Sequence, residues 1–204
     1  MNASWAAASR HLRRADVRLA PIIAQVGPCT LKRERHAFRT LVESIVSQQI
    51  SFKAAEAILG RFRALFPGRP FPSPAEVLAM PPDRLRGAGL SNQKMTYVRD
   101  LAAKFADGTI RPGRFARLAD DDIAEQLIQV KGIGRWTAEM FLMFALNRPD
   151  VLPVDDLGLR KAMQRLYRLR KLPNAETIER LAEPWHPYRT IATWYLWRSL
   201  ADGA

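Results

Sequence analysis

The stretch that decides the fold covers residues 127–144 and reads LIQVKGIGRWTAEMFLMF. Apolar side chains recur at helical spacing on both sides of its two glycines, so the pattern predicts a helix, a tight turn and a second helix. Glycine at positions 132 and 134 permits a positive φ and lets another molecule approach the backbone closely. The first N–H groups of the second helix have no acceptor within that helix, which makes the turn a ready site for an anion.

Two interpretations of this turn stay open at this point. It is either an ordinary helix–helix corner that ends on a glycine, or a clamp for a phosphate group. The Gly-Ile-Gly sequence alone does not separate them, because both structures need the same backbone freedom. The remainder of the chain has to decide.

Composition favours a polyanionic partner. The chain of 204 residues holds 32 Lys and Arg against 20 Asp and Glu, a formal charge of +12. Such an excess of cations binds phosphates with release of counterions. The single cysteine, Cys29, excludes an internal disulfide and a cysteine-only metal cluster. No apolar run reaches the roughly 20 residues of a membrane span, so we expect no membrane partner.

Helical periodicity extends over most of the chain and predicts an all-α fold with two helical lobes. We expect one lobe from residues 1–35 and 147–204, and a central lobe from residues 36–146 that ends in the glycine turn. A first helix is predicted over residues 4–26. Several helix starts have polar caps, since a side-chain oxygen there accepts an otherwise unpaired N–H. The predicted caps are Ser73, Ser91 and Asn174, and the run Asp120–Asp122 marks a further helix start.

Three groups of residues could carry chemistry. Asp155 and Asp156 follow a loop and precede a helix, where the simplest role of an aspartate is to cap the helix. One cap suffices, so the second carboxylate would be available near a reacting centre. Trp136 and Trp197 are candidates for a binding pocket, with core packing as the alternative. Gln48 and Gln49 close an otherwise apolar helix, where they are either binding residues or merely solvated amides.

Taken together, these motifs resemble the helix-hairpin-helix DNA glycosylases, specifically the branch of 3-methyladenine DNA glycosylase II. The resemblance rests on the order and spacing of several segments. These are SQQIS at 47–51, GLS at 89–91 with Lys94, VKGIGRWTA at 130–138, LPVDDLGLRK at 152–161 and WHPYR at 185–189. The family implies an active site in the cleft between the two lobes and double-stranded DNA with damaged bases as the partner.

The resemblance also implies roles for individual residues. Asp156 matches the catalytic aspartate, and Asp155 would be its capping neighbour. Main-chain carbonyls of Ile128, Val130 and Gly132 would hold a structural Na⁺ or K⁺, and no cofactor would serve the chemistry. The base pocket would comprise Trp136, Met140, Asp155, Leu157 and Trp197. The DNA-binding set would comprise Gln48, Gln49, Leu90, Ser91, Asn92, Lys94, Lys131, Gly132, Gly134 and Thr137, with Asn92 as the wedge that enters the duplex.

Several departures from the family pattern refine the expected activity. Trp136 stands where bifunctional members carry a Schiff-base lysine, so no strand cleavage at the abasic site is expected. Lys131 replaces a proline that is common in the hairpin. Met140 stands in place of an aromatic, and Leu157 with Gly158 leaves the pocket roomier.

We therefore predict a monomeric, monofunctional glycosylase that excises alkylated bases. It would work in the cytoplasm or nucleoid of a bacterium, or in the nucleus of a eukaryote. Two alternatives stay open. The pocket could serve another lesion, such as uracil, hypoxanthine or an oxidised purine. The chain could also be a damage-binding module without catalysis.

Overall fold

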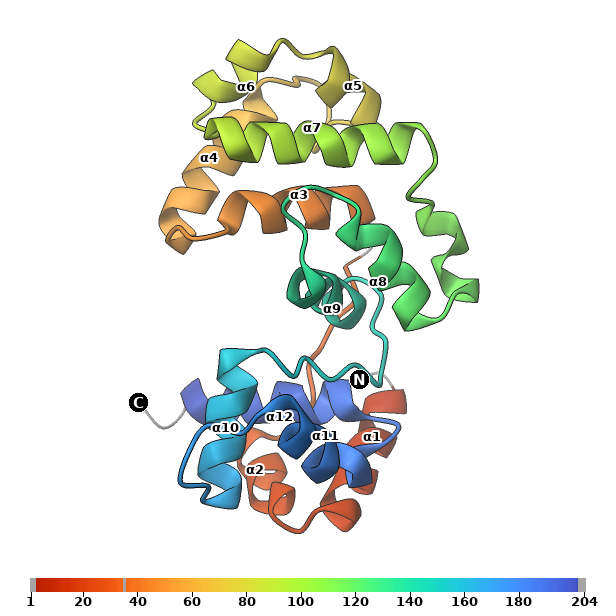
Figure 1. Ribbon diagram of the computed structural model, residues 1–204, viewed down its shortest axis with the longest axis vertical. Coiled ribbons are helices and arrows are strands. Elements are labelled where there is room, and N and C mark those ends of the chain that lie inside the picture. The colour runs from red at the N-terminus through yellow and green to blue at the C-terminus, as the bar shows by residue number, and fades with distance from the viewer. Residues whose placement is uncertain (1–2, 35, 202–204) are drawn as a thin grey trace. The chain divides into compact units, whose positions relative to one another are not determined.

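The computed structural model describes residues 3–34 and 36–201 (Figure 1). Within these ranges the chain forms helices and no strands, which confirms the predicted all-α fold. None of these helices is both long and apolar enough to cross a membrane. In order they are α1 (Ala3–Ala15), α2 (Leu19–Val26), α3 (Ala37–Ser47), α4 (Phe52–Ala64), α5 (Pro74–Ala79), α6 (Pro82–Gly87), α7 (Asn92–Ala106), η1 (Pro112–Arg117), α8 (Asp120–Ile128), α9 (Arg135–Phe144), α10 (Leu157–Tyr167), α11 (Ala175–Ala182), η2 (Glu183–Trp185) and α12 (Arg189–Ala201).

The chain divides into two compact units. Unit 1 joins Met1–Arg33 to Leu142–Ala204, and unit 2 is Glu34–Phe141. The division at residue 141 falls in the last turn of α9, a few residues before the one that the sequence suggested. The hairpin therefore belongs to unit 2, whereas Asp156 belongs to unit 1.

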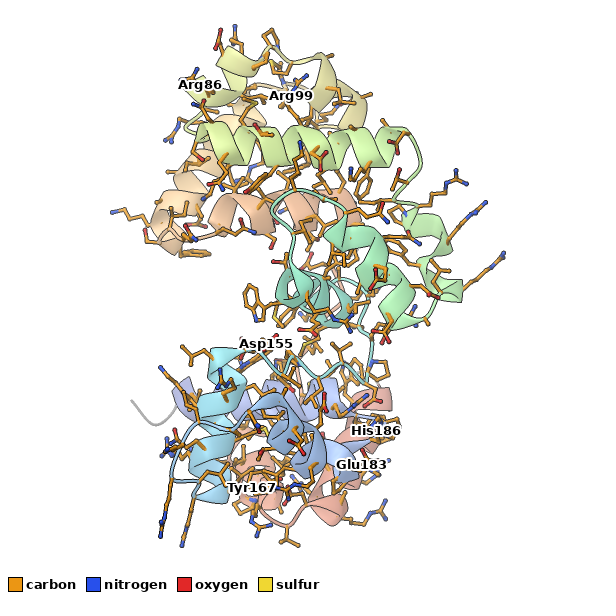
Figure 2. All side chains as sticks on the ribbon, viewed as in Figure 1. Arg86, Arg99, Asp155, Tyr167, Glu183 and His186 are labelled. Atoms are coloured by element: carbon orange, nitrogen blue, oxygen red, sulfur yellow. The ribbon has the colours of Figure 1, made fainter. Side chains whose placement is uncertain are left out.

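Helix α7 is the central helix of unit 2. Figure 1 shows α3 along one side of it and α5 and α6 along the other, and all three pack against it. Arg99 of α7 reaches the C-terminal end of α5, where its guanidinium donates to the carbonyls of Leu78 and Met80 (Figure 2). These bonds satisfy carbonyls that a helix end leaves without a partner. Apolar residues of the unit close its core, among them Leu41, Ile45, Phe62, Leu101, Phe115, Leu127 and Phe141.

Helix α12 is the core of unit 1, since every residue from 191 to 196 is buried. It packs against α10, α2 and α1. The carboxylate of Asp16 lies in the same core and accepts from the Trp185 indole and from the Tyr167 hydroxyl. Burial and this carboxylate together raise the pKa of Tyr167 well above its ordinary value.

The predicted single helix over residues 4–26 is interrupted at Asp16. Its other oxygen accepts the N–H of Arg18 at 3.0 Å, and the chain turns between α1 and α2. An aspartate that bonds a nearby backbone N–H offers the chain an alternative to the helix. The single long helix is therefore wrong, although both segments beside the break are helical, as their apolar periodicity predicts.

The predicted helix caps at Ser73, Ser91 and Asn174 are confirmed. Each side-chain oxygen accepts the N–H three residues on. Ser73 and Glu76 form a complete capping box, because the Glu76 carboxylate also accepts the Ser73 N–H. The aspartate run forms the first turn of α8, as expected.

Candidate nucleic-acid interface and candidate active-site carboxylate

The glycine hairpin is a tight turn between α8 and α9. The N–H of Ile133 donates to the carbonyl of Val130 at 3.0 Å, and Gly132 has a φ of 83°. A bond from the first to the fourth residue, with a positive φ at the third, is the pattern of a type II turn. Lys131 then occupies the second position, and Gly132 occupies the third, which requires glycine.

The two glycines of the hairpin have different reasons to be there. A Cβ on Gly132 would lie 2.0 Å from the ring of Tyr97, so no side chain fits. Gly134 has no atom within 4 Å of its Cβ position and its φ lies outside the left-handed region. Nothing inside the protein therefore demands glycine at 134. An exposed gap at that position leaves room for a partner molecule to approach the backbone.

Helix α9 begins directly after Gly134, whose carbonyl accepts the N–H of Ala138. Its first turn contains no acidic residue. Arg135 donates to Asp121 at 2.6 Å and to Glu139 at 3.3 Å, and these bonds, Asp121 foremost, raise the pKa of its guanidinium. The predicted phosphate contact Thr137 is only 6% exposed, so its side chain lies within the protein, whereas Trp136 is 45% exposed.

Side chains from distant parts of unit 2 hold the turn. The Nε2 of Gln48 donates to the carbonyl of Gly132 at 2.8 Å. Oδ2 of Asp100 accepts the N–H of Lys131, also at 2.8 Å. Gln48 was a predicted site residue, whereas sequence reasoning missed Asp100 and Tyr97. The available signal was their i, i+3 spacing on α7, which places both on one helix face.

The bond from Gln48 bears on the predicted cation site. An amide N–H aimed at the Gly132 carbonyl would turn its positive hydrogen toward a cation bound at that oxygen. The carbonyl of Val130 already accepts the N–H of Ile133. A carbonyl oxygen has two lone pairs, so each of these two oxygens can still bind a second partner. The Na⁺ or K⁺ site at the carbonyls of Ile128, Val130 and Gly132 stays a prediction.

The segment predicted as the wedge is the beginning of α7. Leu90 is 4% exposed, so its side chain packs in the core, and its place among the DNA contacts stays a prediction. Asn92 is exposed and is the first residue of the helix, capped by Ser91. A hollow beside this segment is lined by Asp83, Arg86, Gly87, Leu90, Ser91 and Asn92. Asn92 as the wedge stays a prediction.

Lys94 has internal partners. Its ammonium donates to the carbonyls of Val46 and Gln48 at 2.6 and 2.7 Å, which closes the C-terminal end of α3. Partial burial lowers the pKa of this amine below its ordinary value. The side chain thus ties α7 to α3 and fixes the backbone of Gln48. Gln49, next to it, is exposed and has a φ of 57°.

In unit 1, Asp156 caps α10. Its Oδ1 accepts the N–H of Leu159 at 2.6 Å. Asp155 was expected to be the capping neighbour, and this is wrong: Asp155 is exposed just before the helix begins (Figure 2). The cap and the candidate catalytic group are the same side chain.

The indole of Trp197 fixes the same oxygen of Asp156. Its Nε1 donates to Oδ1 at 2.8 Å. The indole ring stacks on Phe144 with centroids 5.9 Å apart and planes 18° apart. A Cβ on Gly158 would lie 3.0 Å from both Asp156 Oδ1 and the Trp197 Nε1, so this glycine makes room for the bond. Phe144 and Gly158 complete a corner that sequence reasoning described only in part.

The residues predicted for the base pocket are distributed over both units. Asp155, Asp156, Leu157 and Trp197 lie in unit 1, where Leu157 is 52% exposed. Trp136 and Met140 lie one turn apart on α9 in unit 2. The structure thus brings Asp156 and Trp197 together. A single pocket formed by all of them stays a prediction.

A helical protein with a +12 charge, an open glycine hairpin and a hydrogen-bonded carboxylate has the features of an enzyme that acts on nucleic acid. Comparison with known families supports this class. The chain belongs to the HhH-GPD superfamily of base excision DNA repair proteins, whose family model matches residues 42–187.

Named relatives and solved structures agree with the family. DNA-3-methyladenine glycosylase 1 of Schizosaccharomyces pombe is 37% identical over 188 residues, which covers 91% of this chain and 82% of the relative. The S. pombe 3-methyladenine DNA glycosylase Mag1, solved in complex with abasic DNA, is 36% identical with a TM-score of 0.83, over 95% of this chain and 96% of that one. A DNA-3-methyladenine glycosidase from Bacillus halodurans is 34% identical with a TM-score of 0.87, over 96% and 91%.

Proposed function

We propose that the protein is a monofunctional DNA glycosylase that excises alkylated bases of the 3-methyladenine type and leaves an abasic site. The observation that carries the proposal is the Asp156 corner. A carboxylate held by a backbone N–H and an indole N–H is fixed in position before any substrate binds. The relatives named as 3-methyladenine glycosylases supply the substrate class.

The chemistry of such a base suits a single carboxylate. An N3-alkylated adenine carries positive charge and leaves without much help from a general acid. The sugar left behind resembles an oxocarbenium ion, and a fixed carboxylate stabilises that charge and orients the attacking water. Asp156 would supply both functions. This reaction requires no cofactor, and we expect excision to persist in the presence of EDTA.

Binding must offset the cost of moving the base out of the duplex, which is a few kcal/mol. The hairpin is suited to hold a phosphate, since Gly134 leaves space and the first amides of α9 point outward along the helix axis. The excess of Arg and Lys would add affinity without sequence preference. The exposed indole of Trp136 could attract a cationic base, an interaction worth up to about 2 kcal/mol when water is excluded.

We also infer that the enzyme does not cut the DNA strand. Strand cleavage of this kind proceeds through a Schiff base with a lysine amine. In the family pattern that lysine falls on position 136, where this chain has tryptophan. The product should therefore stay intact until heated in alkali, and borohydride should trap no covalent complex. The protein would work wherever the chromosomal DNA of its cell lies.

The test is release of bases from a panel of duplexes that contain 3-methyladenine, 7-methylguanine, hypoxanthine, uracil or an oxidised purine. We expect release of the methylated purines above all others. Preferential release of a neutral lesion would overturn the proposed substrate class. Tight binding to abasic-site DNA with no release from any duplex would instead identify a damage-binding module.

A further inference from the structure

The backbone N–H of Lys131 has a hydrogen-bond partner outside the turn. In a type II turn the N–H of the second residue takes no part in the bond that closes the turn. Here that N–H donates to Asp100 on α7, 31 positions earlier in the sequence, at 2.8 Å. The other oxygen of Asp100 meets the ammonium of Lys104 at 3.4 Å. An acidic side chain thus lies beside a hairpin suited to bind an anion.

Helix α7 supports the turn at a second point. Tyr97, one turn before Asp100, places its ring where a Cβ of residue 132 would be. Lys94, one turn earlier again, fixes the carbonyl of Gln48, and the amide of Gln48 donates to Gly132. The residues at 94, 97 and 100 follow i, i+3 spacing on one face of α7. One face of α7 therefore holds the backbone of the turn in place, through hydrogen bonds and through contact with the Tyr97 ring.

We propose that Asp100 is a positioning residue for DNA binding: its carboxylate accepts the Lys131 N–H and fixes the turn that presents the hairpin amides to a phosphate. This inference rests on the proposed function, because it assumes that the hairpin binds DNA. The negative charge of Asp100 opposes a nearby phosphate. The hydrogen bond that Asp100 accepts favours DNA binding and its charge disfavours it, so the two effects have opposite signs.

Proline at position 131 separates the two effects. Proline favours the second position of a type II turn and has no N–H, so a turn with proline there needs no acceptor. In a Lys131→Pro background the proline Cδ takes the place of the N–H hydrogen, so the Asp100 carboxylate has nothing to accept there and must move aside. Asp100 would then only crowd the turn and repel the phosphate. In a Lys131→Ala background the N–H remains and only the lysine charge is lost. The alanine variant is therefore the matched control for the proline variant.

The experiment introduces Asp100→Ala into three backgrounds, which are the wild-type chain, Lys131→Ala and Lys131→Pro, and measures the Kd for an abasic-analogue duplex. We expect Asp100→Ala to weaken binding about tenfold in the first two backgrounds. In the proline background the same change should leave the Kd within about twofold or tighten it. Excision at saturating enzyme should fall less than about twofold, so that the effect lies in KM rather than kcat. An equal loss in all three backgrounds would overturn the proposal.

Amide hydrogen exchange in the free protein gives a readout that needs no DNA. The Lys131 amide should be protected in the wild-type protein and should exchange at least about tenfold faster in Asp100→Ala. An unprotected Lys131 amide in the wild-type protein refutes the positioning role even if the enzyme excises bases. Conversely, a protected amide in a protein that neither binds nor excises supports the contact and refutes the proposed function.

Asp107, the residue directly after α7, provides a matched control. It accepts the N–H of Thr109 at 2.8 Å at the far end of α7, about 10 Å along the axis from Asp100. Asp107→Ala removes the same charge and the same kind of bond. It should change neither the exchange of the Lys131 amide nor the Kd by more than about twofold. A loss equal to that of Asp100→Ala would show that any acidic residue on α7 matters, and would overturn the specific role.

Discussion

Helices α9 and α10 both begin after a tight turn, but their N-terminal ends are built in opposite ways. Helix α9 follows Gly134 and has neither a side-chain cap from that residue nor an acid in its first turn. Helix α10 follows Asp156, whose carboxylate accepts a hydrogen bond from one of the N–H groups that have no partner within the helix. The positive end of the first helix has no carboxylate in its first turn, whereas that of the second already holds one.

The difference indicates two functions. A helix start with space at Gly134 is suited to bind an anion from outside, such as a DNA phosphate. A carboxylate bonded to the Leu159 N–H and to Trp197 Nε1 is held in one orientation before the substrate arrives. It can then stabilise a cation that develops during the reaction without first having to reorient. We therefore expect the first helix start to bind the substrate and the second to carry the chemistry.

The largest effect should come from Asp156→Asn, which tests the second helix start. Asparagine retains an oxygen that can cap α10 and accept the Trp197 indole, so the fold should survive. Loss of the negative charge should slow single-turnover excision of a methylated purine by at least about a hundredfold. Affinity for abasic-analogue DNA should change by less than about threefold. Rates from single-turnover assays and a Kd from fluorescence anisotropy check both expectations.

Asp155→Asn is the matched control, because it removes the same charge one residue earlier on an exposed side chain. Excision should be within about threefold of the wild-type rate, as for most surface changes. If Asp155→Asn abolishes excision and Asp156→Asn does not, the catalytic assignment is off by one position.

The pair Gly132→Ala and Gly134→Ala tests the first helix start. Alanine at 132 must adopt a left-handed φ and would contact the Tyr97 ring, a strain of about 1–3 kcal/mol. It should lower the melting temperature and weaken DNA binding by about 10- to 100-fold. Alanine at 134 meets nothing in the protein, so its melting temperature should be unchanged while its Kd for DNA rises. Equal behaviour of both variants in DNA binding and in melting would break the comparison.

Trp197→Phe should have a moderate effect on the Asp156 corner. Phenylalanine can still stack on Phe144 but lacks the indole N–H that bonds Oδ1. Loss of one net hydrogen bond predicts a fall of about fivefold in the single-turnover rate. The KM should change little because an aromatic ring remains. If Trp197→Phe excises at the wild-type rate while Asp156→Asn remains defective, the N–H of Leu159 in α10 alone positions the carboxylate.

Local sequence rules predicted those parts of the fold that depend on neighbouring residues. Caps at Ser73, Ser91 and Asn174 require only an oxygen three residues before an N–H, and all three are present. The turn at Gly132 follows in the same way from glycine and its flanking apolar residues. The break after α1 was missed because Asp16 acts through the core as well as locally, with partners at Trp185 and Tyr167.

The site was predictable only as far as single residues matched a motif. Asp156, Gln48 and the two glycines were found in this way. Asp100 and Phe144 were not, because their contacts with Lys131 and Trp197 span tens of residues and depend on how helices pack. The burial of the Leu90 side chain was missed for the same reason. The cap at Asp156 rather than Asp155 is instead a local contact over three residues. A motif places a residue along the chain, whereas packing decides which way its side chain faces.

The capping box of α5 offers the smallest test, since it resembles the start of α10 without any proposed chemistry. Bonds from the Ser73 hydroxyl and N–H lower the pKa of Glu76 below its ordinary value of 4.5, so folding favours the ionised form. This stabilisation is present above about pH 4.5 and is lost as the pH falls through the lower pKa of the folded state. Glu76→Gln should therefore melt on the order of 1–2 °C below the wild-type protein at pH 7, with the gap closing toward about pH 3. Melting curves across this range check the sign, and excision at pH 7 should be unchanged. If Glu76→Gln lowered excision as much as Trp197→Phe, a lost helix cap in general would reduce the rate. The fall in Trp197→Phe would then not show that the position of Asp156 matters.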